Sequence, residues 1–330
     1  MSRAILCGLM LCATTAIANN AISASDFSYP RKPIRLIVPF VPGSGTDVLA
    51  REISLPLTLA WGQPVVVDNR PGAGGMSGSA LVAGAEADGH TLLLANVAAL
   101  AIAPAMQSKP AYAALRDFSP VTQLAGTANA MVVHPSLKLY SVRDLLSRSG
   151  DNREALRYAS GGTGTAGHLT GELLRTLTKI NILHVPYKGS PAAMNSLLTA
   201  QTDMSFTSLV STTPHIASQR LRAIAVTSLK RSKILPDIPT LDEGGVKGFE
   251  VSGWQATLVP TGTPAVTIRK LQHHIADIIL APDVSARMAG LGLDMIGSSP
   301  REFARYLESE VSKWSTLITN LGLKGSQTDN

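Results

Sequence analysis

The sequence predicts an α/β protein whose two lobes surround a ligand cleft. Short apolar runs alternate with amphipathic stretches, as in a parallel sheet covered by helices. Two of these runs end in glycine-rich loops that open a helix, and ligands of such folds bind at the carboxyl ends of the strands. The 330 residues are enough for one large domain or two medium ones, and 45% apolar residues can fill a sizeable core.

The first unit begins with a buried strand at 34–38, followed by a helix at 46–59 with Leu49, Ile53 and Leu57 on one face. Pro56 lies inside that helix, so we expect it to kink the helix or end it early. The unit continues with a strand at 65–67, a helix at 77–87 and a strand at 91–94.

The middle of the chain repeats this alternation. Ser141 to Asp144 has the pattern of a capping box, and Ser190-Pro191 has the order of an N-cap followed by proline at the first helical position. A third helix follows the second glycine loop and extends to about residue 178. The strands expected here lie at 131–133, 157–160, 182–187, 204–206 and 223–227.

The last part of the chain is predicted to be helical. Ser299 to Glu302 is a capping box with Pro300 at the first helical position. We read the apolar stripes at three- and four-residue spacing as core. They comprise Ile268, Leu271, Ile275, Ile278 and Ile279, then Phe303, Leu307, Val311, Trp314, Ile318 and Leu321.

The segments "VTQLAGTANAMVVH" and "FEVSGWQATLVP" are the expected crossings between the lobes. Lobe 1 is therefore discontinuous. We expect it to comprise residues 25–124 and 251–330, with lobe 2 at residues 125–250.

Residues 1–24 have the pattern of a secretory signal peptide. Arg3 precedes the apolar run "AILCGLMLCATTAIA", which is too short for a membrane span, and we favour cleavage after Ala24. Cys7 and Cys12 lie inside this segment and each follows a leucine, so we expect no lipid anchor. The mature chain would have no cysteine. Export without disulfides favours a bacterial periplasm.

Charge and composition exclude some classes of function. The net charge is +6, and losing Arg3 leaves 28 basic against 23 acidic residues, a charge of +5. Basic residues are scattered and aromatic residues make up only 5%, so we expect no nucleic-acid binding. The excess of positive charge suits an acidic small ligand.

The first glycine loop, Gly43 to Asp47, does not match a nucleotide-binding motif. It has no Lys-Ser/Thr pair after the glycines, and Val48 stands where the dinucleotide fingerprint needs glycine. Glycines let a backbone approach a ligand, and the amides of a helix's first turn favour an anion. The alternative is a tight turn capped by Thr46 or Asp47, and the loop alone does not separate the two.

The second loop, "GGTGTAGH", contains Gly162-x-Gly164-x-x-Gly167 between a strand and a helix. The next strand offers no acid for a ribose, so we expect no NAD and no other cofactor. The loop still offers hydroxyl groups and first-turn amides, the same chemistry as the first loop. His168 either touches the ligand or makes a local hydrogen bond, and Glu172 faces it one helical turn later.

The sequence contains none of the common motifs that place catalytic or metal-binding residues at fixed spacing. There is no G-x-S-x-G elbow, no S-x-x-K pair and no H-E-x-x-H, so we expect neither catalytic residues nor a metal site.

A third loop, Arg70 to Gly75, either binds ligand or forms a surface turn held by Asn69 or Arg70. Tyr187 and Asp203 lie at the ends of elements. The carboxylate of Asp203 either accepts a hydrogen bond from an ammonium or amide group of a ligand or caps the local turn.

Many segments in one order resemble the receptors of the tripartite tricarboxylate transporters, the Bug (Bordetella uptake gene) family. The resemblance extends from about Tyr29 to Lys324. The segments that carry it include "PFVPGSGTDVLAR", "VVVDNRPGAGGMSGSALVA", "ADGHTLLLAN", "HVPYKGS", "LRAIAVTSLKRSKILPDIPTLDE" and "WQATLVPTGTP".

This resemblance implies a type II periplasmic-binding-protein fold with a hinge, and a small carboxylate or amide-bearing ligand held by two strand–helix loops. Lobe 2 would add an acid, Asp203. It also implies transient contact with integral-membrane transporter subunits, and we expect a monomer. The expected site is Phe40, Pro42, Gly43, Ser44, Gly45, Thr46, Asp47, Ser160, Gly161, Thr163, Gly164, Thr165, His168, Tyr187 and Asp203.

The loops depart from the family pattern at a few positions. Ser44 stands between glycines where the family often has consecutive glycines, and Gly162 precedes Thr163 where Ser or Asn is common. Two other functions share some of these features, a sensor module for a membrane signalling partner and an exported enzyme acting on a carboxylate. The sensor has the same binding chemistry, so the sequence does not separate it from a transport receptor.

Overall fold

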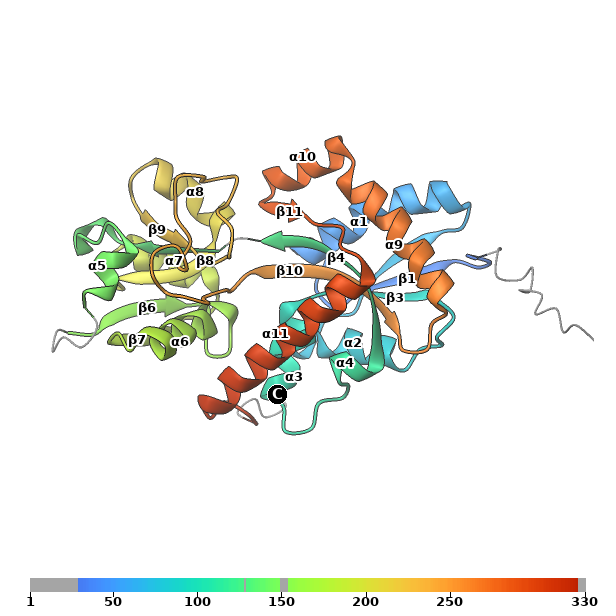
Figure 1. Cartoon of the computed structure of the whole chain (residues 1–330), viewed down its shortest axis with the longest axis horizontal. Helices are drawn as coiled ribbons and strands as arrows, with labels where there is room; N and C mark the ends of the chain where they lie inside the picture. The colour runs from blue at the N-terminus through green and yellow to red at the C-terminus, as the bar shows by residue number, and fades with distance from the viewer. Residues whose placement is uncertain (1–28, 128, 149–153, 326–330) are drawn as a thin grey trace, which may run out of the picture.

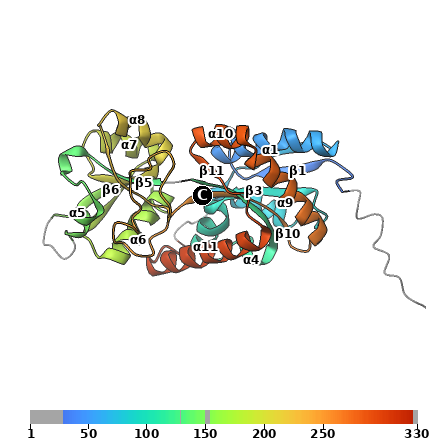
Figure 2. The same cartoon turned by 45° about the horizontal axis from the view of Figure 1, so that its top comes forward.

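The computed structural model describes residues 29–127, 129–148 and 154–325. The predicted signal peptide at 1–24 lies outside them. Two sheets lie side by side along the long axis of the molecule, each with helices on both faces (Figures 1 and 2). We call the six-stranded sheet with its helices lobe 1 and the five-stranded sheet with its helices lobe 2. The α/β prediction is confirmed.

The sheet of lobe 1 has the strand order β11-β4-β10-β3-β1-β2. β1 is parallel to β2 and β3, whereas β10 is antiparallel to β3 and β4, and β11 is antiparallel to β4. The strands are β1 (Ile34–Val38), β2 (Val65–Asn69), β3 (Thr91–Asn96), β4 (Phe118–Thr127), β10 (Gly253–Pro260) and β11 (Leu293–Met295).

Helices cover both faces of this sheet. α1 and α9 bury their apolar stripes on one face, and α2 and α11 pack on the other. The capping box of α11 forms as predicted. The helices are α1 (Gly45–Trp61), α2 (Met76–Ala83), α3 (Ala103–Met106), α4 (Ala114–Asp117), α9 (Ala265–Leu280), α10 (Pro282–Gly290) and α11 (Pro300–Asn320), with a 3₁₀ turn (Ala73–Gly75) and a π-helical turn (Ala98–Ile102).

Pro56 does not end α1 early, so of the two expected effects, a kink or an early end, the early end is wrong. The helix continues to Trp61 and ends at Gly62, which has the left-handed φ of 63°. Leu57 follows the proline and is as deeply buried as Leu49 and Ile53 before it. Packing of this stripe on both sides of the proline outweighs the loss of one backbone donor, because tertiary contacts supply most of a helix's stability.

The sheet of lobe 2 has the order β7-β6-β8-β5-β9. β6 is parallel to β7 and β8, and β5 is antiparallel to β8 and β9. The elements are β5 (Asn129–Val133), a 3₁₀ turn (Pro135–Leu137), α5 (Val142–Leu146), β6 (Leu156–Ser160), α6 (Ala166–Thr178), β7 (Ile182–Pro186), α7 (Ser190–Leu198), β8 (Met204–Ser208), α8 (Leu209–Ala217) and β9 (Arg222–Val226).

One helix start in lobe 2 differs from its prediction. Gly189 is the N-cap of α7, and Ser190 is already the first helical residue. The amide of Gly189 donates to the carbonyl oxygen of Gly161, which fixes the chain one residue before the expected cap. The predicted cap at Ser141 forms, since its hydroxyl accepts from the amide of Asp144. The carboxylate of Asp144 accepts from the amide of Tyr140, one residue before the Ser141 amide that a capping box would use.

The register of the strands shows which way the glycine loops face. β4 leaves lobe 1 at Thr127, and β5 enters lobe 2 at Asn129, paired with Ser208 at the carboxyl end of β8. Since β6 is parallel to β8, its carboxyl end also faces lobe 1. In lobe 1, Gln255 near the start of β10 pairs with Asn96 at the end of β3, so β1 likewise ends toward lobe 2.

Candidate functional site

The first loop is a strand–helix turn whose shape depends on Gly43. This residue has φ 80°, a left-handed conformation that favours glycine. Ser44 is the N-cap of α1, and its hydroxyl accepts from the amide of Asp47 at 3.3 Å. The amide of Gly43 in turn donates to the Asp47 carboxylate at 2.8 Å. The loop is therefore closed by its own side chains before any ligand arrives.

Asp47 braces this loop instead of facing solvent. Its side chain is 3% exposed and forms a two-bond ion pair with Arg51, at 3.0 Å for each bond. Asn69 donates to the same carboxylate at 2.9 Å and to the carbonyl oxygen of Phe40 at 3.0 Å. Burial alone would raise the pKa of this carboxyl group, but hydrogen bonds from Arg51, Gly43 and Asn69 outweigh it and hold the pKa below its ordinary value.

The second loop is built in the same way. Gly164 also has φ 80°. Thr165 is the N-cap of α6, and its hydroxyl accepts from the amide of His168. The amide of Gly164 donates to Nδ1 of His168 at 3.0 Å, so that nitrogen carries a lone pair and not a proton. The side chain of the third helical residue thus accepts from the glycine amide four residues earlier, as Asp47 does in lobe 1.

Ser160 lies under the second loop and does not face solvent. It is 2% exposed, and its hydroxyl is bonded to Nε2 of His184 at 2.7 Å and accepts from the amide of Gly162 at 3.1 Å. Tyr187 follows β7 directly, and its amide donates to the carbonyl oxygen of Ser160 at 3.0 Å. The structure therefore brings Tyr187 and Gly161 beside the loop. His184 is a part of this assembly that the sequence analysis did not single out.

Donors remain for a ligand at both loops. Among the described residues, the amides of Gly45, Thr46, Ala166 and Gly167 have no hydrogen-bond partner. They lie in the first turns of α1 and α6, where an anion is favoured. Thr163 is exposed, and within the same described part of the chain its hydroxyl has no partner. Both loops therefore offer hydrogen-bond donors that suit a carboxylate.

A hollow of about 350 Å³ opens beside the second loop, between the first turns of α6, α7 and α8. The sequence analysis missed most of its hydroxyl-bearing wall, although the run "SFTSLVSTT" at a strand end was a signal for it. Its polar lining residues are Asn129, Ser160, Thr165, Ser190, Ser205, Thr207, Ser208 and Ser211.

The structure does not bring Asp203 to this site. It precedes β8, at the end of the lobe 2 sheet that points away from lobe 1, and its backbone oxygen accepts from the amide of His134. Its carboxylate accepts from the amide of Arg157 at 2.7 Å and pairs with the guanidinium of the same residue. The geometry fits the alternative of local capping, so we leave Asp203 out of the site.

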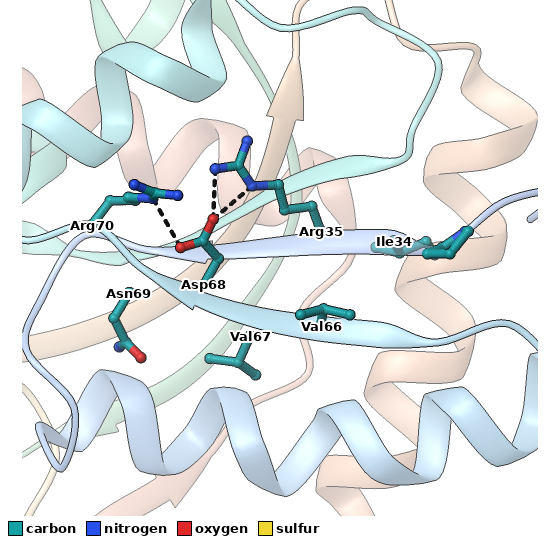
Figure 3. Close-up of a pocket in the computed structure, with 8 residues that line it drawn as sticks. Ile34, Arg35, Val66, Val67, Asp68, Asn69 and Arg70 are labelled. Atoms are coloured by element: carbon teal, nitrogen blue, oxygen red, sulfur yellow. Dashed lines mark hydrogen bonds and ion pairs between the residues drawn. The ribbon is translucent and has the colours of Figure 1, made fainter.

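A larger hollow, of about 530 Å³, lies over β1 and β2 (Figure 3). Asp68 there accepts from Arg35 at 2.7 Å and pairs with Arg70 at 2.9 Å. Burial alone would raise the pKa of Asp68, but both arginines outweigh it and hold that pKa below its ordinary value. These charges are already compensated and no helix start points at them, so we place the candidate site at the two loops despite the smaller hollow there.

The third loop, Arg70 to Gly75, packs against the first loop. A Cβ atom on Gly75 would lie 3.0 Å from the Phe40 ring, so this glycine allows the two loops to pack together. Asn69 holds the backbone of the first loop at the carbonyl oxygen of Phe40, and Arg70 pairs with Asp68. In the described ranges, no cluster of three or more His, Cys, Asp or Glu residues could hold a metal ion, and no helix is long and apolar enough to cross a membrane.

Two α/β lobes joined by crossing strands, with an anion-accepting loop on each facing edge, are the features of a periplasmic solute-binding protein. A family model described as "Tripartite tricarboxylate transporter family receptor" matches residues 49–323, so the chain belongs to this family of receptors, TctC. The predicted family is therefore confirmed.

Two relatives match nearly the whole chain. One is a protein from the tcbD-tcbE intergenic region of Pseudomonas sp. strain P51, 37% identical over 98% of this chain and 96% of its own length. The other is BugT of Bordetella pertussis, 34% identical over 94% of this chain and 95% of its own length.

Solved structures of the family have the same two-lobed fold. R. palustris Rpa4515 with adipate is 32% identical, covers 89% of this chain and 98% of its own, and gives a TM-score of 0.71. MatC of Rhodopseudomonas palustris with bound malate is 28% identical over 88% of this chain and all of its own, with a TM-score of 0.69. A ligand-free TctC protein from Polaromonas is 25% identical over 88% of this chain and 99% of its own, with a TM-score of 0.79.

Proposed function

We propose that this receptor binds a small organic carboxylate between its lobes and closes around it. The observation that carries the proposal is the pair of equivalent loops on facing sheet edges, each with first-turn amides that lack a partner among the described residues. One carboxylate has two oxygen atoms and can accept from both loops at once. The adipate and malate found in two family structures are ligands of this class.

Closure needs only that the ligand binds the closed arrangement better than the open one. The chain gives a higher TM-score with the ligand-free Polaromonas structure than with the adipate or malate forms, although its identity with the former is lower. We propose that the lobes are open without ligand, and this order of TM-scores supports it. The crossing strands β4 and β10 are then the hinge. We propose the expected two lobes, 25–124 with 251–330 and 125–250, with each boundary moved to the cross-strand pair Thr127 and Gly253, because Ala125 to Thr127 still pair with β11 in the sheet of lobe 1.

Export and delivery are parts of the same proposal. The signal peptide at 1–24 would be cleaved after Ala24, and the mature monomer would present its ligand to integral-membrane transporter subunits. Neither a cofactor nor a catalytic group is needed for that role. A sensor that signals through a membrane partner would use the same loops, and pull-down from membrane extract with and without ligand separates the two functions.

The test is calorimetric titration of the mature protein with adipate and with malate, together with native mass spectrometry of gently purified protein to identify any ligand that co-purifies. We expect one carboxylate per chain and a smaller radius of gyration in solution scattering when it is bound. A carboxylate that is chemically altered after incubation would show an enzyme instead. Absence of binding across a panel of mono-, di- and tricarboxylates would contradict the proposal.

A further inference from the structure

Three aromatic rings from three elements form one stack beneath the second loop. His168 from α6 lies on His184 from β7, with 4.0 Å between ring centroids and 29° between planes. Tyr158 from β6 lies 5.0 Å from His184 at 30°. Gly171 makes this packing possible, since a Cβ atom there would lie 2.3 Å from the Tyr158 ring. His168 is 6% exposed.

Both imidazoles of this stack are bonded to the same loop. His168 accepts from the amide of Gly164 at 3.0 Å. His184 is joined to the hydroxyl of Ser160 at 2.7 Å, and that hydroxyl accepts from the amide of Gly162 at 3.1 Å. One half of the loop therefore depends on His184 and the other half on His168, while the stack fixes the distance between the two rings.

The bond to Gly164 requires a neutral His168. A proton on Nδ1 would point at the Gly164 amide, and the positive end of the α6 dipole also disfavours a charged ring. Burial lowers the pKa of His168, against the opposing charge of Glu172. Burial and then the neighbouring His168 lower the pKa of His184 to about 4.

The other groups around the stack leave it neutral. The Glu172 carboxylate accepts from the Tyr158 hydroxyl at 2.7 Å and from Arg175 at 2.8 and 2.6 Å, so its charge is compensated by the arginine. Phe206 from β8 packs edge-on against Tyr158. The facing groups are thus a compensated carboxylate, a phenol and an apolar ring.

We infer that His168 and His184 are positioning residues that act as one neutral stacked pair and hold the loop from Ser160 to Gly164 in the shape that receives the ligand. The inference rests on the proposed function, because it assigns these two residues to the same site. Lobe 1 makes the equivalent bond with Asp47, which is charged and paired with Arg51. The two halves of the grip are therefore held by chemically different braces, a charged carboxylate in lobe 1 and a neutral imidazole pair in lobe 2.

The test compares matched variants in two measurements. His168→Phe keeps a ring in the stack but removes the acceptor, whereas Oδ1 in His168→Asn lies near the position of Nδ1. His184→Phe and His184→Gln form the same pair for Nε2. Amide exchange at Gly162 and Gly164 is measured by NMR in the ligand-free protein, and affinity is measured by calorimetry with adipate and malate as probes.

We expect exchange at Gly164 about tenfold faster and affinity about tenfold weaker in His168→Phe, with both largely restored in His168→Asn. His184→Phe and His184→Gln should differ in the same way at Gly162. In the unsubstituted protein, protection of Gly162 should fall as the pH approaches 4, because burial lowers the pKa of His184 to about 4, and in His184→Gln it should not. The NMR chemical shifts of the His168 ring nitrogens in the unsubstituted protein at pH 7 should show an unprotonated Nδ1. This measurement needs no variant, so it tests the inference even if a variant does not fold.

Equal behaviour of the Phe and amide variants, or a protonated Nδ1 at pH 7, would overturn the inference. If the unsubstituted protein binds neither probe nor any carboxylate of the panel, the proposed function is overturned, and the exchange rates and ring shifts alone decide whether the stack positions the loop. If the probes bind equally well to all four variants, the proposed function stands and the inference fails.

Discussion

Trp254 in the crossing strand β10 donates its indole N–H to the carboxylate of Glu310 in α11 at 2.9 Å. Trp314, one turn further along the same helix, donates to the same oxygen at 3.1 Å. Glu310 is 1% exposed and also pairs with Lys313, which in turn donates to the carbonyl oxygen of Glu250 at 3.0 Å. The last helix of the chain therefore anchors the return crossing between the lobes.

Replacing Glu310 by leucine should be strongly destabilising. The change leaves two buried indole donors without an acceptor and Lys313 without its counter-charge, so we expect the free energy of unfolding to fall by about 3 kcal/mol. Urea denaturation measures it. Glu308→Gln, on the exposed face of the same helix, is the matched control and should change little. A loss of equal size in both variants would contradict the assigned role of Glu310.

Gly45→Ala should separate binding from stability. A Cβ atom at Gly45 meets nothing within 4 Å in the ligand-free protein, so the thermal midpoint should not fall. If a carboxylate approaches the amide of this residue, the added methyl group blocks it and the affinity drops at least about tenfold. Gly290→Ala, where a Cβ atom also meets nothing within 4 Å, is the control at the far end of α10. Unchanged carboxylate affinity in Gly45→Ala would place the ligand elsewhere.

The two threonines of the second loop should respond differently to valine. The exposed Thr163 has no hydroxyl partner among the described residues, so Thr163→Val should weaken carboxylate binding by about 1–2 kcal/mol and leave folding unchanged. Thr165 is the N-cap of α6 and donates to the carbonyl oxygen of Gly162 at 2.7 Å, so Thr165→Val should also cost about 1 kcal/mol of stability. Thr176→Val, about three turns further along α6, is the control. Calorimetry and urea melts on the same samples decide between the two effects.

The stability of the protein should decline in mild acid. Burial lowers the pKa of His184 to about 4, below the ordinary value of 6.5, so between these values the unfolded chain binds the proton and the folded chain does not. The contribution of His184 to the free energy of unfolding is therefore fully present above about pH 6.5. It falls by roughly 2 kcal/mol as the pH drops to about 4, less than the full pKa shift would give, because His184 is only partly buried and solvent screens its charge.

His184→Gln should flatten that decline, and His273→Gln, whose side chain is 73% exposed, should not. Urea midpoints at pH 7, 6, 5 and 4 give the slopes. A variant slope identical to that of the unsubstituted protein would show that other groups cause the acid sensitivity.

Local patterns in the sequence were enough for most of the fold. The apolar runs before both glycine loops and the capping box at Ser299 are local signals, and both lie where they were expected. The early end expected at Pro56 does not occur, because the effect of this proline depends on packing against residues far away in the sequence. The short strand β11 was missed because three residues at a sheet edge carry no periodicity that differs from a loop.

The candidate site likewise has one part that local sequence patterns predict and one part that only the folded chain shows. The two loops were found because glycine, hydroxyl residues and a helix start are neighbours in the sequence. Whether Asp47 and Ser160 face a ligand or brace a loop depends on Arg51, Asn69 and His184, and only the folded chain brings these residues together. Asp203 lies directly before β8, and the sequence alone does not show that this end of the strand is at the edge of the sheet away from lobe 1.

Thr127 at the end of β4 and Gly253 at the start of β10 are direct cross-strand partners. The chain thus enters and leaves lobe 2 through two neighbouring positions, and the whole of lobe 2 is one insertion between them. A graft from a relative needs only these two junctions, and the lobe 1 loop with its Asp47 brace stays untouched. We therefore expect that exchanging this one contiguous block, in the laboratory or by recombination between genes, changes the ligand preference while the loop of lobe 1 is kept.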